Sequence, residues 1–211
     1  MAGDIKEEPT TEPLPGTRQP RGRKRRAEIL AGARKLFAQR GFRGTSVAML
    51  AEEIGITDAG LLYHFPTKNA LLLAVLEETD EEQETRLAGD LDTADAHYIS
   101  AWSEFGQVLE DDPVLTALDV LMSAEHLQTD SDFNQYFQQR YDTFRDRLVR
   151  SLEAGRDAGV FKADFDPLTE AVLMLATLDG LRLQWLLSGG RISMAEAMRY
   201  FIRHMEARLR G

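Results

Sequence analysis

The chain has 211 residues, of which 43% are hydrophobic, so it can bury a substantial core in one large domain or two small ones. It contains no cysteine, which excludes disulfides, thiolate metal sites and cysteine nucleophiles, and its four histidines are scattered along the sequence. We therefore expect no metal and no cofactor. The net charge of −10 argues against a polyanionic partner, unless the charge is unevenly distributed.

Residues 1–20 are predicted to form a disordered tail, because they combine prolines and acidic residues without any apolar period. The tail lacks the apolar segment of a secretory signal or membrane anchor. No later stretch has the roughly 18 uninterrupted apolar residues that a membrane-spanning helix needs. We therefore expect a cytoplasmic protein without a membrane partner.

Positive charge is concentrated between Arg18 and Arg43, where ten basic residues and one acidic residue give a local net charge of +9. The residues before this stretch carry −3, and residues 44–211 carry −16. Such segregation is typical of a protein that presents one basic face to phosphate groups. A solvated basic tail without any function would show the same run of charge.

The first two helices are predicted from apolar residues that recur at three- and four-residue spacing. The first helix runs from Arg25 to a stop signal at Gly41. The second is barely two turns long, follows the potential caps Thr45 and Ser46, and ends at Gly55.

A third short helix is capped by Thr57 and ends before Pro66, whose ring cannot continue it. Thr67 opens a fourth helix with an acidic end. The rest of the chain is predicted to be helical, since it has no alternating apolar run that would suggest a sheet. The expected helices are 98–109, 113–127, 131–157, 167–187 and 193–209.

The second and third predicted helices have the spacing of a helix-turn-helix, with Gly55 and Ile56 between them. The glycine permits the chain to reverse, and Ala51 lets the helices approach closely. In this geometry the second helix offers its N-terminal side chains to the major groove of DNA. An ordinary helical hairpin could show the same spacing, but the adjacent basic stretch favours DNA binding.

The run from Arg25 to Leu76 resembles the DNA-binding head of TetR-type transcriptional regulators. The resemblance is carried by Phe37, Gly41, Phe42, Thr45, Ser46, Ala51, Gly55, His64, Phe65 and Lys68. It implies an all-α fold, with a three-helix DNA-binding head in residues 21–68 and a helical effector-binding and dimerisation domain in residues 69–211. It also implies a homodimer that binds a palindromic DNA operator and is released by a small-molecule effector.

Ten residues are candidate DNA contacts by their position in this pattern. They are Arg25 in the basic stretch, Thr45 and Ser46 for phosphate, Thr57, Asp58, Ala59 and Gly60 for base edges, and Tyr63, His64 and Lys68 for the DNA backbone. The family has a tyrosine where this chain has Leu62, so either Tyr63 takes over that backbone contact or Leu62 joins the core. Asp58 either accepts a hydrogen bond from cytosine or complements the helix dipole, and His64 either donates to phosphate or packs as a ring.

The stretch from Leu178 to Leu187 resembles the dimerisation helix of one TetR subgroup. With the last predicted helix it would pair with its copy as a four-helix bundle, in which Gly180 would allow a close helix approach. The expected interface residues are Leu178, Gly180, Trp185, Met198, Phe201 and Met205. The same two helices would show this pattern in the core of a monomer.

Aromatic and methionine side chains on the middle helices have the composition of an apolar ligand cavity. The candidate effector contacts are Trp102, Phe105, Met122, His126, Phe137 and Tyr141, and the effector is expected to be partly apolar. Such residues could equally fill a plain core, and His126 could lie on the surface at a helix end.

The sequence therefore favours a DNA-binding repressor controlled by a small molecule. The alternative is an effector-independent DNA-binding or architectural protein, in which the aromatic residues only fill a core. An enzyme is not expected, because the sequence has no paired catalytic constellation, phosphate loop or nucleophile motif.

Overall fold

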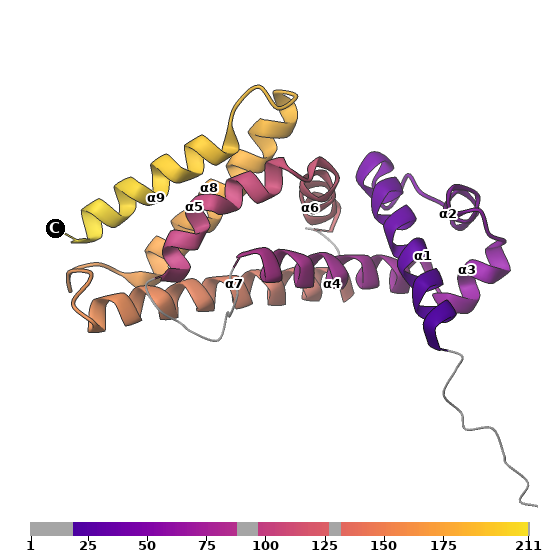
Figure 1. The fold of residues 1–211 in the computed structure, drawn as a ribbon, viewed down its shortest axis with the longest axis horizontal. Coiled ribbons are helices and arrows are strands. Elements are labelled where there is room, and N and C mark those ends of the chain that lie inside the picture. Colours follow the sequence, from indigo (N-terminus) through magenta and orange to yellow (C-terminus); the bar gives the residue numbers. More distant parts are fainter. Residues whose placement is uncertain (1–18, 88–96, 127–131, 211) are drawn as a thin grey trace, which may run out of the picture.

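The computed structural model describes residues 19–87, 97–126 and 132–210, and within these ranges the regular structure is entirely helical (Figure 1). The helices are α1 (Gln19–Arg40), α2 (Val47–Ile54), α3 (Asp58–His64), α4 (Lys68–Leu87), α5 (His97–Glu110), α6 (Pro113–Glu125), α7 (Asp132–Asp157), α8 (Pro167–Leu187) and α9 (Met194–Arg210). The all-α prediction is confirmed. None of the described helices is long and apolar enough to cross a membrane.

The helix boundaries agree closely with the sequence pattern in the C-terminal half and differ at the N-terminus. α8 starts as predicted, because the Asp166 carboxylate caps its first turn and Pro167 occupies the first helical position. α1 instead begins at Gln19, within the segment predicted as a tail and before the expected start at Arg25. The basic residues of this extension have no apolar period, so the hydrophobic pattern could not reveal it.

The first three helices form a small head around an apolar core. Phe37 of α1, Leu50 of α2 and Leu61 of α3 are at most 2% exposed. Gly32 lets α1 and α2 touch, since a Cβ atom at this position would lie 2.7 Å from Cγ1 of Ile54. This close approach fixes the two helices against each other.

Two helices, α4 and α6, join the head to the rest of the chain. α6 packs against α1, and its Leu118 and Met122 belong to the same buried cluster as Phe37 of the head (Figure 1). α4 leaves the head and reaches α7, whose Tyr136 donates a hydrogen bond to Asp80 of α4. The domain boundary predicted between residues 68 and 69 falls at the start of α4 and stays a prediction.

Helices α5, α7, α8 and α9 form the body around a second core. α5 and α9 approach closely at Gly106, where an added Cβ atom would lie 2.8 Å from Cα of Ala195. Gly180 has no such neighbour, because no atom in the described part of the chain lies within 4 Å of an added Cβ. The close helix approach expected at Gly180 is therefore absent within the subunit.

Candidate DNA-binding surface and effector cavity

The turn between α2 and α3 has the geometry of a helix-turn-helix. Ser46 caps α2, its Oγ accepting a hydrogen bond from the Met49 N–H at 3.2 Å. α2 ends at Gly55, whose φ of 71° and ψ of 42° lie in the left-handed region that glycine adopts without strain. Thr57 then caps α3, its Oγ1 accepting from the Gly60 N–H at 3.0 Å. These local hydrogen bonds fix the angle between the two short helices.

The start of α3 is open to solvent on one side and packed on the other. Thr57, Asp58 and Ala59 are exposed and Gly60 is half-buried, whereas Leu61 is buried against the head core. The structure thus brings the four predicted base-reading residues together on one free surface.

The end of α3 carries two exposed side chains. Tyr63 is 85% exposed and Leu62 is 40% exposed, so Leu62 does not join the core. The Tyr63 ring meets the half-buried His64 ring edge-on, with 5.5 Å between the ring centres. The Tyr63 phenol is therefore free to reach a ligand outside the protein.

Lys68 is held inside the head. Its Nζ donates hydrogen bonds to the carbonyl oxygens of Phe42 and Thr45, each at 2.8 Å, and lies 4.0 Å from the centre of the Phe42 ring. Partial burial lowers the pKa of Lys68. Thr45 is 2% exposed, and its Oγ1 donates to the Gly41 carbonyl at 2.7 Å. Both residues thus shape the loop before α2, because its turned backbone needs donors for its carbonyls, and their predicted contacts with DNA stay predictions.

Two basic residues near the start of α1, Arg25 and Arg26, make surface contacts. Arg25 pairs with Glu28 one turn along the helix, at 2.8 Å, and both side chains are at least 40% exposed. The Arg26 guanidinium lies 4.8 Å from the centre of the Phe65 ring. A surface pair of this kind is weak, so it does not fix the Arg25 side chain in place.

The loop that Lys68 holds also touches the end of α6. Glu125 accepts a hydrogen bond from the Phe42 N–H at 2.8 Å, and the Phe42 ring centre lies 5.6 Å from that of His126 and 5.3 Å from that of Phe133. His126 is 6% exposed, which contradicts a surface position. The sequence did not predict this contact of Glu125, because a single glutamate in an acidic chain does not indicate which group it will contact.

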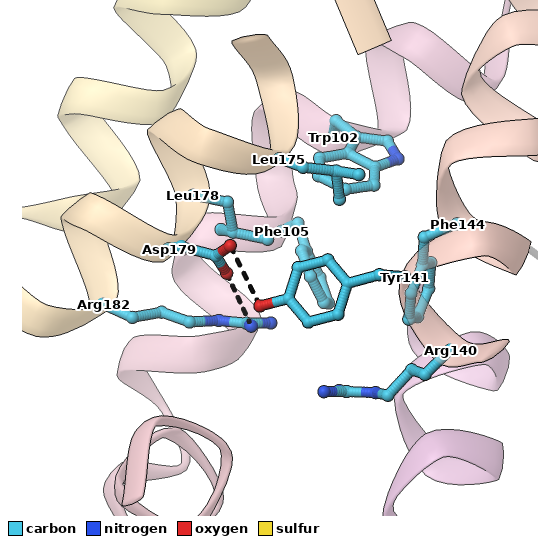
Figure 2. Close-up of a pocket in the computed structure, with 9 residues that line it drawn as sticks. All are labelled: Trp102, Phe105, Arg140, Tyr141, Phe144, Leu175, Leu178, Asp179 and Arg182. Carbon is cyan, nitrogen blue, oxygen red and sulfur yellow. Dashed lines mark hydrogen bonds and ion pairs between the residues drawn. The ribbon is translucent and has the colours of Figure 1, made fainter. Parts of the chain in front are cut away.

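A cavity between α5, α7 and α8 collects aromatic side chains (Figure 2). It is lined by Trp102, Phe105, Phe144, Leu175 and Leu178, with the polar Arg140, Tyr141, Asp179 and Arg182. Three of the six predicted effector contacts, Trp102, Phe105 and Tyr141, therefore lie together. The free volume is about 20 Å³, so this aromatic end is nearly filled by its own side chains.

Two further hollows share residues with the aromatic cavity. One, of about 210 Å³, lies between α6 and α8 and includes Tyr141 and Arg182 in its lining. The other opens widely and is lined in part by Tyr141 and by the predicted contacts His126 and Phe137. Met122 of α6 lines none of these three spaces, because it is fully buried against the head.

Charged side chains from four helices form a cluster beside the cavity, which we call the charge network and of which Arg140, Asp119 and Arg182 are buried. Arg140 of α7 donates to Asp80 of α4 at 2.7 Å and to Asp119 of α6 at 3.3 Å. Arg182 of α8 lies 3.5 Å from Asp119 and 3.6 Å from Asp179. The sequence did not reveal this network, because scattered acids and arginines on helices usually form solvated faces.

The acids of the charge network differ in their preference for a proton. Burial raises the pKa of Asp80 and of Asp179. Burial also acts to raise the pKa of Asp119, but the guanidinium groups of Arg140 and Arg182 together bring it below its usual value. Asp119 is therefore held as a carboxylate between the two arginines.

The residues predicted at a dimer interface fall into two groups. Three are at most 3% exposed and belong to the subunit's own core: Leu178, Met198 and Met205. That part of the prediction is corrected, since the apolar period identified a face that packs inside the body. Gly180, Trp185 and Phe201 are half-buried.

A different set of apolar side chains is exposed along α8 and α9, and we call this surface the outer face. Each is at least 46% exposed: Leu168, Val172, Leu173, Leu183 and Leu187 of α8 and Tyr200 of α9. Leu187 is the most exposed of them, at 77%. An extended apolar surface of this kind indicates an interaction site.

A helix-turn-helix with a free second helix, joined to a helical body with an internal cavity, defines a DNA-binding transcriptional regulator. Comparison with models of known protein families shows which family of regulators the chain resembles. Residues 29–75 match the model of bacterial regulatory proteins of the tetR family, and residues 101–210 match that of the C-terminal domain of BetI-type transcriptional repressors. The chain belongs to the TetR family and is a transcriptional regulator, not an enzyme.

Similar proteins cover most of the chain. It is 28% identical over 165 residues to the HTH-type transcriptional regulator YfiR of Bacillus subtilis, covering 75% of this chain and 78% of that protein. It is 25% identical over 183 residues to the HTH-type transcriptional repressor KstR2 of Rhodococcus jostii, covering 84% and 87%. A transcriptional regulator from Saccharomonospora viridis, solved in complex with choline, has a TM-score of 0.72 and 25% identity, covering 87% of this chain and 95% of that one.

Proposed function

We propose that the protein is a cytoplasmic, homodimeric repressor that binds a palindromic DNA operator and is released by a small-molecule effector. The observation that carries the proposal is the free surface at the start of α3, held at a fixed angle by Ser46, Gly55 and Thr57. A short helix presented in this way fits the major groove, where each base pair has a distinct pattern of donors and acceptors.

Base reading falls to the start of α3. Thr57 and Asp58 supply the polar groups of this surface, and Ala59 and Gly60 let the helix approach the base edges. The Thr57 hydroxyl already accepts from the Gly60 N–H, and it can still donate to a base.

Phosphate contacts surround this surface. Ser46 lies at the N-terminus of α2, where free backbone N–H groups favour an anion. Tyr63 and His64 supply side-chain donors at the other end of α3, and Arg25 can exchange its weak surface partner for a phosphate. Lys68 and Thr45 support this arrangement indirectly, by holding the loop before α2.

The outer face is the proposed dimer interface. Two copies related by a two-fold axis would cover each other's exposed side chains, and Gly180 and Trp185 of α8 would lie within this contact. Dimerisation also suits the head, because one short recognition helix rarely gives sufficient affinity alone.

The cavity and its neighbouring hollows form the proposed effector site. The regulator from Saccharomonospora viridis binds choline, which supports a small-molecule ligand for this fold. A ligand beside Tyr141 would lie next to Arg140, whose partners Asp80 and Asp119 belong to α4 and α6. Since these two helices join the head to the body, a shift there would change the position of the head.

A binding assay with the full-length protein and a DNA site selected from genomic fragments tests the assignment of contacts. Substituting Thr57→Val or Asp58→Asn should change which sequences bind, whereas Tyr63→Phe should weaken all sequences about equally. The reverse pattern would contradict the proposed division between base and phosphate contacts.

Sedimentation of a charged variant tests the dimer. Leu187→Glu places a carboxylate in the outer face, and the variant should sediment as a monomer and lose its affinity for the operator. Val160→Glu is the matched control, because Val160 is also exposed but lies between α7 and α8, outside the outer face. A dimeric Leu187→Glu variant would place the interface elsewhere.

One observation favours the effector-independent alternative, namely the aromatic end of the cavity, which has only about 20 Å³ of free volume. A ligand must then use one of the two hollows beside it, which have volumes of about 210 Å³ and about 560 Å³. Direct measurement of small-molecule binding distinguishes the two functions.

A further inference from the structure

Arg182 is a buried cation whose donors are largely unused. Its side chain is 7% exposed, and its ion pairs with Asp119 and Asp179 are long, at 3.5 Å and 3.6 Å. Its Nε–H has no hydrogen-bond acceptor within residues 19–87, 97–126 and 132–210. Because buried donors in native proteins almost always have an acceptor, we expect a further acceptor beside the Arg182 guanidinium.

Arg182 lies at the edge of a hollow, where a bound ligand can supply the missing acceptor. Figure 2 shows its guanidinium next to the Tyr141 hydroxyl, with Asp179 facing both. Arg182 lines the aromatic cavity and also the hollow of about 210 Å³ between α6 and α8. The apolar part of that hollow includes Val120 and Ala124. The hollow therefore combines an unused buried donor with an apolar wall.

The charges already present restrict the charge of the ligand. The charge network has three carboxyl groups and two guanidinium groups, so an additional anion would meet an excess of acidic groups. A cation offers no acceptor to the unused donors of Arg182 and would lie against its positive charge. An uncharged acceptor avoids both conflicts.

We propose that Arg182 anchors an uncharged, apolar ligand through a carbonyl-type oxygen, in the hollow between α6 and α8. The oxygen accepts a hydrogen bond from the terminal N–H groups of the Arg182 guanidinium, whose ion pairs with two aspartates are long, and the apolar body of the ligand packs against Val120 and Ala124. The role of this ligand as an effector rests on the proposed function, whereas its binding does not.

Equilibrium dialysis of the full-length protein against four naphthalene probes tests the ligand class. Naphthalene, 2-acetylnaphthalene, 2-naphthoate and 2-naphthylmethylammonium share an apolar body and differ in carrying no head group, a carbonyl, a carboxylate or an ammonium group. The ketone should bind at least about tenfold more tightly than the other three, through one hydrogen bond to a charged donor. Tightest binding of the carboxylate or the ammonium, or no binding of the ketone, would overturn the proposal.

Substitution of the anchor tests the residue. Arg182→Lys keeps the positive charge in the network but replaces the forked guanidinium donors with a shorter ammonium group, and it should weaken binding of 2-acetylnaphthalene about tenfold while leaving naphthalene unchanged. Arg199→Lys, at an exposed ion pair with Glu104, is the matched control and should change neither. An unchanged affinity for the ketone in Arg182→Lys would overturn the assignment. If that variant does not fold, the relative affinities of the four probes for the unsubstituted protein still test the proposal.

DNA binding by the same protein, measured without any probe, separates this inference from the proposed function. A protein that binds its DNA site but not the ketone would overturn the ligand inference and leave DNA binding intact. A protein that binds the ketone but no DNA would support the ligand site and contradict the proposed function.

Discussion

The polar contacts of the helix-turn-helix and those of the body differ in how far apart in the sequence their partners lie. In the helix-turn-helix, the deciding contacts join near neighbours, such as Ser46 with Met49 and Thr57 with Gly60. In the body, the charge network joins α4, α6, α7 and α8, whose residues are far apart in the chain. Short-range contacts fix a rigid reading surface, whereas long-range polar contacts can rearrange when one partner changes. This difference suits a fixed DNA reader coupled to an adjustable sensor.

The largest effect is expected from Arg140→Met in the body. The substitution leaves Asp80 and Asp119 without the guanidinium that bridges them, and breaking a buried ion pair costs about 3–5 kcal/mol. The free energy of unfolding, measured in urea, should fall by this amount. Arg145→Met removes only the surface pair with Asp142 and should cost less than about 1 kcal/mol. Equal losses in the two variants would contradict the importance of the charge network.

The next effect concerns Lys68, which joins parts of the head that are far apart in the sequence. Lys68→Met removes the donor to the carbonyls of Phe42 and Thr45, which should cost about 1–3 kcal/mol of unfolding free energy. Affinity should fall about equally for all DNA sequences, because the loop before α2 is disturbed. The dependence of affinity on salt should stay unchanged, and a slope reduced by about one would show that Lys68 contacts phosphate directly.

A smaller effect is expected at the turn glycine of the head. Gly55 has a φ of 71°, so Gly55→Ala should cost about 1–2 kcal/mol of unfolding free energy. Gly159 in the body has the same φ and is equally free of neighbouring atoms, so Gly159→Ala should cost a similar amount. Only the Gly55 variant should weaken DNA binding, as measured by fluorescence anisotropy. A matching loss of affinity in the Gly159 variant would show that the turn has no special role.

The smallest effect is a pH dependence in the body. Burial raises the pKa of Asp179 above its usual value of 3.8, so the folded state favours the protonated carboxyl. The stability that this proton contributes is present below the unfolded pKa and is lost as the pH rises through the folded pKa. Asp179→Asn should therefore raise the urea midpoint at about pH 7 and lose this advantage at about pH 4.

The exposed Asp164 provides the control for this pH dependence, and Asp164→Asn should change the midpoint little at either pH. A gain from Asp179→Asn that is the same at both pH values would contradict a partly buried carboxyl whose pKa is raised.

The sequence was sufficient to predict those helix boundaries that depend on residues close together in the chain. Gly55, Pro66 and the Asp166 cap mark helix ends through local backbone chemistry, and these boundaries could be found without a structure. The apolar period identified the packed face of α9, but it could not tell whether that face meets the same chain or a second copy. Met198 was therefore assigned to the wrong surface, since it is fully buried within the subunit.

Long-range polar partners escaped sequence analysis for a related reason. A lysine or glutamate on a helix shows no sign of the group that it will meet, so the partners of Lys68 and of Glu125 inside the protein were not predicted. The aromatic residues of the cavity were found because their composition is distinctive, whereas Arg182 beside them was not.

Selection of genomic DNA fragments by the purified full-length protein at moderate salt tests the central claim most directly. The account predicts strong enrichment of a two-fold symmetric site, with half-sites one helical turn of DNA or a multiple of it apart, and loss of this enrichment with Leu187→Glu. A protein that sediments as a dimer but enriches no sequence would contradict the assignment of α3 as a reader of DNA.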